Sequence, residues 1–466
     1  MATIPDESSL NHVFHGGPKR TITRITFEPQ RFGILAPVTV SLRFCGIFLQ
    51  PKWVVKRFYI YLSPGKQIEL FSKTGCRFGI PPPPPPSALG RYRLLSPTAG
   101  VHVSPIVLGA GNIGDKWESM GWGTMTKESS FKLLDAYFDN GGNFIDTANA
   151  YQEETSEQFI GEWAEQRGIR DQLFIATKYS TNYKRTDSSV SQKILFAGNG
   201  MKSLHISVSA SLKKLRTSYI DLLYVHWWDF QTSIEEVMRG LHNMVMQGKV
   251  LYLGISDTPA WIVSRANQYA RDHALTPFVI YQGQWSILER SFEREIIPMA
   301  RAEGMALAPW FVLAGGKLRT DAEEQRKVES GDPGRTTLGD WKRNETECAV
   351  SQALEKVANE IGAKSIRSVA IAYVLHKAPY VFPILGGRKS EHLIENIEGL
   401  EVSLTDEHMI YLESILPFEL GFPASLIGTG LKLPDLLTVV DNIDQQPHPR
   451  PIRPQVRDRE PEEDEK

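Results

Sequence analysis

Eight short runs of apolar and β-branched residues recur along the middle of this chain, and they constrain its fold more than any other feature. Most are separated by about 30 residues, and each of the first seven is followed by a segment with helical spacing. The nearly continuous apolarity of each run predicts strands of a parallel sheet that is buried on both faces. The runs are IVLGAG (106–111), NFIDTA (143–148), LFIATK (173–178), DLLYVH (221–226), VLYLGIS (250–256), FVIYQGQ (278–284), MALAPW (305–310) and YVFPIL (380–385).

Eight such strand and helix units close into a barrel, so we predict an α/β fold, a (β/α)8 TIM barrel. The 466 residues of the chain would suit about three average domains, but one barrel commonly takes roughly 250 to 400 residues. The link between the seventh and eighth strands covers about 70 residues and is strongly polar in its first half. We therefore expect a long loop there, and such a loop at the mouth of a barrel can close over a ligand as a lid.

The two ends of the chain differ in composition from the barrel segment, and we expect both to be non-globular. A run of six prolines (81–86) favours polyproline II and predicts a linker over residues 81–90. Residues 1–80 carry eleven Lys and Arg against four Asp and Glu without a sustained structural period, which suggests a basic extension that is disordered or an artefact of the gene model. The barrel is then expected over 91–444, followed by a charged, disordered tail over 445–466.

The charge and cysteine content exclude several classes of function. A formal net charge of −2 gives no electrostatic footprint for nucleic acid. Cys45, Cys76 and Cys348 lie far apart in the sequence, so we expect neither a disulfide framework nor a metal site. The most apolar early stretch, 38–49, contains Arg43 and is too short to span a bilayer. With no secretory signal pattern either, the expected location is the cytoplasm, without a membrane partner.

Two motifs in the sequence are typical of other folds. GAGNIG (109–114) matches the GxGxxG fingerprint of a Rossmann fold, but that fingerprint needs a helix to begin at once, and here helical spacing resumes only near Thr126. Tyr373 and Lys377 form the YxxxK pair of short-chain dehydrogenases. They lie on an amphipathic helical segment where this spacing needs no chemistry, so we interpret them as structural.

Four polar residues stand at or just after the carboxyl ends of successive predicted strands. Each has an ordinary explanation taken alone: Asp146 as a cap, Tyr151 as an interface aromatic, Lys178 as a rim lysine and His226 as a satisfied core histidine. In a barrel, however, the carboxyl ends of the strands converge on one mouth, where active sites are built. Four such residues in successive units therefore predict a catalytic constellation.

The chemistry that these four residues suit is proton transfer to a carbonyl group. A free phenol has a pKa near 10 and needs a neighbouring cation to stabilise its phenolate, which Lys178 can supply. Asp146 can keep that buried ammonium charged, since an isolated buried charge tends to be neutralised. His226 can donate a hydrogen bond where negative charge develops on the substrate oxygen. No metal ion is required.

Longer motifs around these residues resemble the aldo-keto reductases, in particular their fungal aryl-alcohol dehydrogenase and norsolorinic acid reductase branch. The motifs are GNFIDTANAYQEETSEQFIGEW, SLKKLRTSYIDLLYVHWWDFQTSIEEVM, QGKVLYLGISDTPAW and APYVFPILGGRKSEHLIENIEGL, and the resemblance runs from about residue 83 to about residue 453. It implies that Asp146, Tyr151, Lys178 and His226 form the family's catalytic tetrad, with Tyr151 as general acid. It also implies an NADPH-dependent oxidoreductase that interconverts an aryl or alkyl aldehyde or ketone and its alcohol, in secondary metabolism or aromatic-alcohol turnover.

The same resemblance assigns the NADP(H) site. Ser256 and Gln282 match the positions that hold the nicotinamide carboxamide, Trp310 matches the aromatic residue that stacks on the ring, and Asp257 stands where the wider family usually has asparagine. An ionised carboxylate accepts hydrogen bonds but cannot donate them. The loop after the last strand matches the adenosine-phosphate site, in which glycines, basic side chains and free helix amides would bind a 2′-phosphate. Its residues are Gly386, Gly387, Arg388, Lys389, His392 and Asn396, of which Asn396 is best placed for the adenine.

The substrate side is less defined by the sequence. Trp117, Trp227 and Trp228 can line an aromatic pocket or pack as barrel-rim residues. The expected ligand is a small carbonyl compound or alcohol, with the protein acting as a monomer or homodimer. An alternative is an NADPH-binding regulatory or redox-sensing subunit of the same fold with little turnover, as some members of the family are. Robust NADPH oxidation with a simple aromatic aldehyde would favour the enzyme.

Overall fold

The computed structural model describes residues 82–122, 124–331 and 340–454, together with four strands nearer the N-terminus. The chain forms two compact units, Met1–Pro84 and Pro85–Lys466. The first contains an antiparallel sheet in the order β1-β2-β3-β4. The residues of these strands are β1 (Ile22–Thr26), β2 (Thr39–Gly46), β3 (Val55–Leu62) and β4 (Lys66–Glu69).

These four strands were not expected from the sequence. The register between β2 and β3 shifts between Phe44 and Gly46, and such an irregularity breaks the alternation that marks a strand in sequence. The domain boundaries that we predicted remain predictions. Of the expected charged tail, residues 445–454 are described without helix or strand, and residues 455–466 lie outside the described part of the chain.

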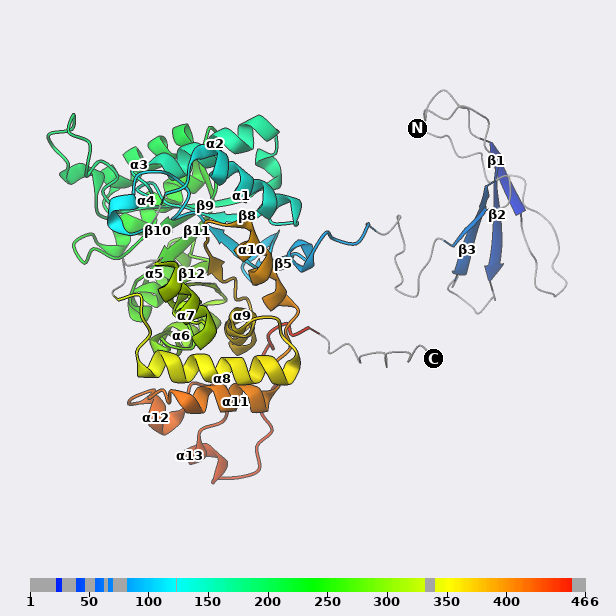
Figure 1. Cartoon of the computed structure of the whole chain (residues 1–466). Helices are drawn as coiled ribbons and strands as arrows, with labels where there is room; N and C mark the ends of the chain where they lie inside the picture. The colour runs from blue at the N-terminus through cyan, green and yellow to red at the C-terminus, as the bar shows by residue number, and fades with distance from the viewer. Residues whose placement is uncertain are drawn as a thin grey trace. The chain divides into compact units, whose positions relative to one another are not determined.

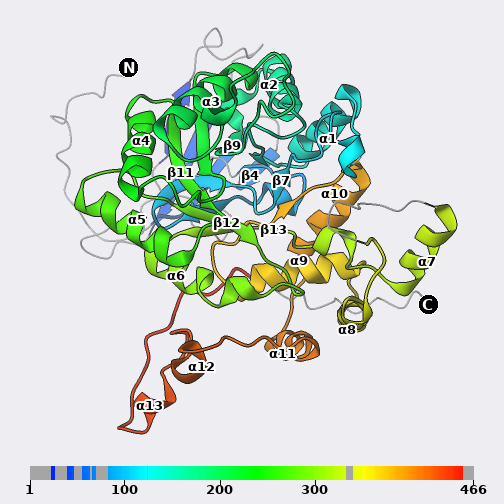
Figure 2. The ribbon, with the colours of Figure 1, turned by 90° about the vertical axis from the view of Figure 1, so that its left-hand side faces the viewer.

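The second unit is built on the predicted sheet of eight parallel strands, which confirms the (β/α)8 barrel (Figures 1 and 2). The strands follow one another in chain order, and the last one lies beside the first. The barrel closes through a parallel bridge between Leu307 and Val381. The eight strands are β7 (Val107–Gly109), β8 (Phe144–Asp146), β9 (Phe174–Tyr179), β10 (Ile220–Val225), β11 (Val250–Ser256), β12 (Ile280–Gln284), β13 (Ala306–Trp310) and β14 (Ile384–Leu385).

Helices surround this sheet because each one presents an apolar stripe to the outer face of the strands. One main helix follows each of the first six barrel strands, and one follows the last. Figure 2 shows α4, α5 and α6 following one another around the sheet. The seven helices are α1 (Lys127–Asp139), α2 (Thr155–Arg167), α3 (Met201–Lys214), α4 (Ile234–Met246), α5 (Ala260–Asp272), α6 (Ile296–Glu303) and α10 (Ser390–Ile397).

A two-stranded hairpin plugs the amino end of the barrel. It consists of β5 (Arg93–Ser96) and β6 (Ala99–Val103), which pair antiparallel. Leu95 and Val103 of this hairpin belong to the same buried cluster as Phe144 and Phe174, the first residues of β8 and β9. Because side chains fill this end of the described barrel, we expect a site at the carboxyl ends of the strands.

The link between β13 and β14 is largely helical and is not a structureless loop. It contains α7 (Asp321–Ser330), α8 (Glu345–Ile361) and α9 (Ile366–Lys377). Residues 332–339, within the polar stretch that we expected to act as a lid, lie outside the described residues. The chain continues after α10 through α11 (Asp406–Ile415), α12 (Ala424–Ile427) and α13 (Asp435–Thr438). Among the described residues, no helix is both long and apolar enough to cross a membrane.

The structure shows where the helices that follow β7 and β8 begin. Helix α1 begins at Lys127, where Thr126 caps it, so the GAGNIG segment does not open a helix and the Rossmann alternative is wrong. Thr155 and Gln158 form no capping box at the start of α2, because the cap position is Glu154, which has a left-handed φ of 79° and no capping side-chain bond. The Thr155 hydroxyl donates instead to the carbonyl oxygen of Gln152 at 2.8 Å.

Candidate active site

The four candidate residues meet at the carboxyl end of the barrel, as the strand positions predicted. Asp146 ends β8, Lys178 is the penultimate residue of β9, and His226 directly follows β10. Tyr151 lies in the turn between β8 and α2. The parallel register places β8, β9 and β10 side by side, so neighbouring strands deliver their polar ends to one place.

The Lys178 ammonium makes three hydrogen bonds, which use all three of its donors. Nζ donates to Asp146 Oδ1 at 2.5 Å, to the Thr147 carbonyl oxygen at 2.7 Å and to the Tyr151 hydroxyl at 3.3 Å. An ammonium cannot accept a hydrogen bond, so the phenol oxygen must accept from Lys178. The Tyr151 O–H is therefore free to donate toward the mouth. Gln282 Nε2 donates to the second Asp146 oxygen at 2.9 Å and so helps to hold the carboxylate that pairs with Lys178.

Burial and nearby charge shift the pKa values of Lys178 and Tyr151 in opposite directions. Burial lowers the pKa of Lys178, but the nearby Asp146 carboxylate and Tyr151 raise it above its usual value. Burial raises the pKa of Tyr151, and the charge of Lys178 only partly offsets this effect. Lys178 thus acts on the phenol in the expected direction, but its charge does not make the phenol more acidic than free tyrosine in this structure. At neutral pH the phenol holds its proton, as a general acid must.

His226 stands next to the phenol as a neutral ring. The rings of Tyr151 and His226 are edge to face, with centroids 6.0 Å apart. Burial, together with the charge of Lys178, lowers the pKa of His226 to about 3. Its Nδ1 lies 3.2 Å from the Thr181 hydroxyl, which also accepts a hydrogen bond from Trp227 Nε1 at 3.0 Å. Thr181 follows Lys178 by three residues at the same strand end, so the rule that selected the four candidates would also have selected it.

Tryptophan side chains form part of the wall around the phenol. Trp117 is edge-on to Tyr151, with ring centroids 5.9 Å apart, and lies 5.5 Å from the ring of Trp122. Trp227 is exposed beside His226, but Trp228 packs into the hydrophobic core around the barrel. Of the three tryptophans that we considered for the substrate pocket, Trp228 is therefore a packing residue.

A strained turn follows Tyr151, and its side chains link the neighbouring loops through hydrogen bonds. Gln152, Glu153 and Glu154 have φ values of 52°, 50° and 79°, which non-glycine residues adopt only at a cost. The Glu153 carboxylate accepts from Trp117 Nε1 at 2.9 Å and from Arg185 Nη2 at 2.5 Å, which joins the loops after β7 and β9. Nothing in the sequence pattern indicated this arrangement, because its partners lie in three different loops.

The proposed nicotinamide end of the site lies beside the tetrad. Ser256 Oγ is buried, and no described residue aligns with it as a hydrogen-bond partner, although the Asp257 carboxylate lies close to it; it can therefore bind a polar group of a ligand. Asp257 Oδ1 accepts from Trp310 Nε1 at 3.3 Å. Although part of the Asp257 side chain remains open to solvent, burial among the surrounding atoms raises its pKa to about 6. Gln282, which we assigned to the carboxamide, holds Asp146 through its amide nitrogen, and this contact was not expected.

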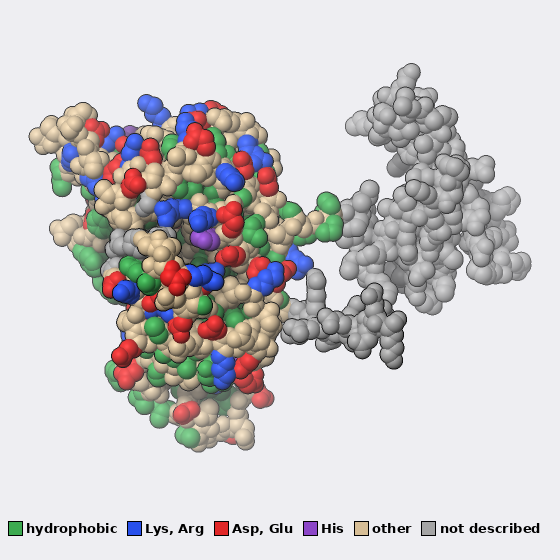
Figure 3. Space-filling model, viewed as in Figure 1, with side chains coloured by type: hydrophobic (Ala, Val, Ile, Leu, Met, Phe, Trp, Pro, Cys, Tyr) green, Lys and Arg blue, Asp and Glu red, His purple; other side chains and the backbone are tan. Residues whose placement is uncertain are grey.

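The loop after β14 has the features of an anion site. An added Cβ at Gly386 would lie 3.3 Å from the Gly109 carbonyl oxygen, so this close approach favours a glycine. Arg388 and Lys389 are exposed, and α10 begins at Ser390 without a capping side-chain bond, which leaves its first amides available. Basic side chains and a histidine are exposed together on the face that carries α10 (Figure 3). Gly386, Gly387, Lys389 and Asn396 border one small hollow, and His392 is exposed nearby.

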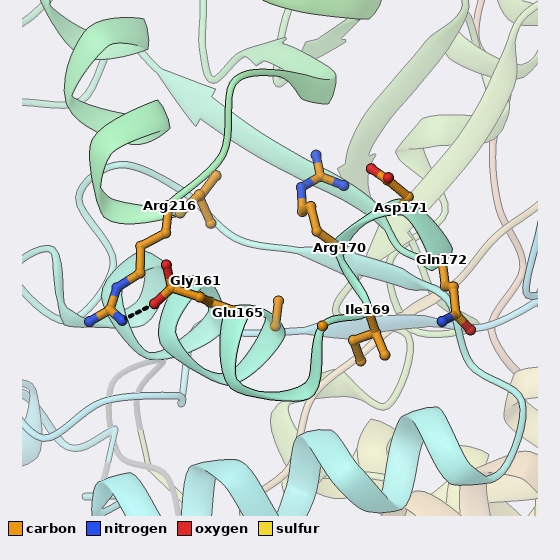
Figure 4. Close-up of a pocket in the computed structure, with 10 residues that line it drawn as sticks. Gly161, Glu165, Ile169, Arg170, Asp171, Gln172 and Arg216 are labelled. Atoms are coloured by element: carbon orange, nitrogen blue, oxygen red, sulfur yellow. Dashed lines mark hydrogen bonds and ion pairs between the residues drawn. The ribbon is translucent and has the colours of Figure 1, made fainter.

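A larger pocket, of about 350 Å³, lies away from this site (Figure 4). It is bordered by the end of α2 and the turn that precedes β9, near the amino ends of the strands. Both of its arginines are already paired: Arg216 binds Glu165 at 2.5 Å and Arg170 binds Asp221 at 2.7 Å. Asp171 accepts a hydrogen bond from the Tyr219 hydroxyl at 2.7 Å, so most of the charge around this hollow is engaged within the protein.

Comparison with known proteins agrees with this geometry. The sequence profile described as "Aldo/keto reductase family" matches residues 105–417. Aryl-alcohol dehydrogenase [NADP(+)] of Phanerodontia chrysosporium is 61% identical over 379 residues, which are 80% of this chain and 98% of the relative. Norsolorinic acid reductase B of Dothistroma septosporum is 51% identical over 340 residues, 73% of this chain and 85% of the relative. With its barrel, the convergence of its four candidate residues and these matches, the chain belongs to the aldo/keto reductase family.

Proposed function

We propose that the protein is an NADPH-dependent oxidoreductase that interconverts an aromatic aldehyde or ketone and its alcohol, with Tyr151 as the general acid. One observation carries this proposal: the Tyr151 hydroxyl accepts a hydrogen bond from Lys178 at 3.3 Å and so presents its own proton to the open mouth. The printed names of the relatives, which include an aryl-alcohol dehydrogenase [NADP(+)], supply the cofactor and the substrate class.

The residues present fit such a cofactor. When bound, NADPH supplies the hydride that is added to the carbonyl carbon. The buried Ser256 hydroxyl would bind the nicotinamide amide, and Trp310 would stack on the ring. Arg388 and Lys389, beside the uncapped start of α10, would bind the 2′-phosphate, and Asn396 would lie near the adenine.

The four residues of the tetrad then take part in the proton transfer. As hydride reaches the carbonyl carbon, the Tyr151 O–H donates its proton to the carbonyl oxygen, and the O–H bond of the phenol breaks. Lys178 stabilises the phenolate that remains, and Asp146 keeps the lysine charged in its buried position. His226, which is neutral, donates a hydrogen bond to the same oxygen where negative charge grows. In alcohol oxidation the same residues act in reverse, with the phenolate as base.

Aromatic walls support a flat, aromatic substrate. Trp117 contacts Tyr151 edge-on, Trp122 packs against Trp117, and the exposed Trp227 lies beside His226. Aromatic rings pair favourably with each other by roughly 0.5 to 1.5 kcal/mol beyond the burial of their area. The three widely spaced cysteines are consistent with action in the reducing cytoplasm.

The test is Tyr151→Phe, which removes only the hydroxyl. NADPH consumption with a simple aromatic aldehyde should fall by at least about 100-fold, as expected for the loss of a general acid. NADPH binding, followed by quenching of protein fluorescence, should remain close to that of the wild type. A variant that kept half of the wild-type rate would refute Tyr151 as the acid. A wild-type protein that bound NADPH tightly but turned over no carbonyl compound would instead support the regulatory subunit.

A further inference from the structure

Thr181 connects the catalytic histidine to an exposed tryptophan. It lies just after β9, and its hydroxyl oxygen is 3.2 Å from His226 Nδ1 and 3.0 Å from Trp227 Nε1. His226 and Trp227 are consecutive residues after β10, so one hydroxyl bridges two loops at the mouth. Neither the tetrad nor the cofactor site accounts for this contact.

The direction of these hydrogen bonds follows from the groups involved. An indole N–H can only donate, so the Thr181 oxygen accepts from Trp227. A hydroxyl has one proton and two acceptor lone pairs, so the bond from Trp227 leaves the Thr181 proton available. Among the contacts of the described residues, His226 Nδ1 is the acceptor that this proton can reach, which favours donation from Thr181 to Nδ1. An Nδ1 that accepts carries no proton, so a neutral imidazole in this position must carry its proton on Nε2.

The backbone around Thr181 is held in place by a second set of contacts. Ser180 has a φ of 101°, a strained value for a residue with a side chain, and it aims the following threonine. The Asn199 side-chain nitrogen donates to Ser180 Oγ at 2.8 Å and to the Trp227 carbonyl oxygen at 2.9 Å. The His226 amide donates to the Tyr179 carbonyl oxygen at 3.1 Å. The three members of the bridge are therefore fixed relative to one another before any substrate binds.

We propose that Thr181, oriented by Trp227, is a positioning residue that keeps His226 in the tautomer with its proton on Nε2. This inference rests on the proposed function, because it is Nε2–H that would donate to the substrate oxygen. In the other tautomer, Nε2 would present a lone pair to the lone pairs of the carbonyl oxygen, and the donor would become a repulsive group. Thr181 itself touches neither the proton that Tyr151 transfers nor the reacting carbon.

The test uses a matched pair of variants, Thr181→Val and Thr181→Ser. Valine keeps the shape but removes the hydroxyl, whereas serine restores it. The first readout is the ¹⁵N spectrum of the histidine side chains in the cofactor-free protein, with the His226 signals identified by their loss in His226→Gln. The wild type and Thr181→Ser should show protonated Nε2, and Thr181→Val should show a mixture of tautomers. Trp227→Phe, which frees the hydroxyl to rotate, should shift the population in the same direction.

The second readout is turnover of an aromatic aldehyde with NADPH. A single hydrogen bond contributes about 1.4 kcal/mol at the upper end of its usual range, so Thr181→Val should lower kcat about 10-fold, and Thr181→Ser should recover most of it. KM for NADPH should stay the same in all variants. Protonated Nδ1 in the wild type, or a Thr181→Val variant with wild-type tautomer and kcat, would overturn the inference. If the wild type reduced no carbonyl compound, the proposed function would fail, but the spectrum would still decide whether Thr181 sets the tautomer.

Discussion

Variants of the buried pair of Lys178 and Asp146 can distinguish its contribution to stability from its contribution to catalysis. Lys178→Met removes the ammonium while keeping most of the side-chain length. Asp146 is 3% exposed and would keep only its hydrogen bond from Gln282. Removing one partner of a buried ion pair typically costs about 3 to 5 kcal/mol, because the other charge stays buried without compensation. We expect Lys178→Met to lose about that much free energy of unfolding at neutral pH, along with its reductase activity.

The double variant Lys178→Met/Asp146→Asn is the matched control. An asparagine side chain is uncharged, and its oxygen can still accept the hydrogen bond from Gln282. The double variant should therefore recover most of the lost stability but none of the activity. The pH dependence gives an independent check. In Lys178→Met, burial raises the pKa of Asp146 above its unfolded value of about 3.9, so its contribution to stability is present at low pH and is lost as pH rises through the raised pKa. The difference in free energy of unfolding between the single and double variants should therefore become smaller as the pH is lowered from about 8 to about 5.

The assay is equilibrium unfolding in urea, followed by tryptophan fluorescence and by circular dichroism. Coincident transitions from the two signals would establish that one free energy describes each variant. Equal slopes against urea would show that the unfolded states are comparable. The reasoning would be refuted by a Lys178→Met variant within about 1 kcal/mol of the wild type at pH 8, or by a double variant less stable than the single one.

Other parts of the protein lead to three further predictions. Arg388→Ala should weaken NADPH binding much more than NADH binding, measured by fluorescence quenching; equal losses would show that Arg388 does not bind the 2′-phosphate. Because burial raises the pKa of Tyr151, aldehyde reduction should hold through neutral pH and fall only in strong alkali, whereas alcohol oxidation should increase with pH; a reduction rate that halves between about pH 6 and about pH 8 would contradict this. Lys377 pairs with Glu293 at 3.1 Å and Glu413 at 2.7 Å, so Lys377→Met should lower stability by about 1 to 3 kcal/mol in urea while kcat per folded molecule stays unchanged; a fall in kcat would mean that this lysine has a catalytic part.

The barrel and the meeting of the candidate residues at one mouth could be predicted because both follow from strand positions. Strands buried on both faces give continuous apolar runs, and parallel strands bring their carboxyl ends together, so Asp146, Lys178 and His226 could be placed at one mouth from the sequence alone. Tyr373 and Lys377 were interpreted as structural for a similar reason, since helical spacing explained them. In the structure they pack against Glu293 and Glu413, as part of a network that supports the outer helices.

The remaining features depend on contacts between segments that are distant in the sequence. The support that Gln282 gives to Asp146 crosses 136 positions, and nothing local marks it. Trp228 and the exposed Trp227 are consecutive residues, and only the packing of the core decides which one faces the mouth. The four N-terminal strands were not predicted; the register shift between Phe44 and Gly46 accounts for this only within β2, because the pairing of β1 with β2 and of β3 with β4 is regular.

The position of Tyr151, the proposed general acid, next to a strained turn has a consequence for engineering. Glu153 and Glu154 each bind a cation from the loop after β9, Arg185 at 2.5 Å and Lys184 at 2.6 Å. That loop would be an obvious target for transplanting specificity from a relative. A graft without two suitably placed cations would leave the two glutamates of this left-handed turn, which begins one residue after Tyr151, chiefly with their bonds to Trp117 and to Lys214. Successful chimaeras should therefore exchange the turn and the loop as a single cassette.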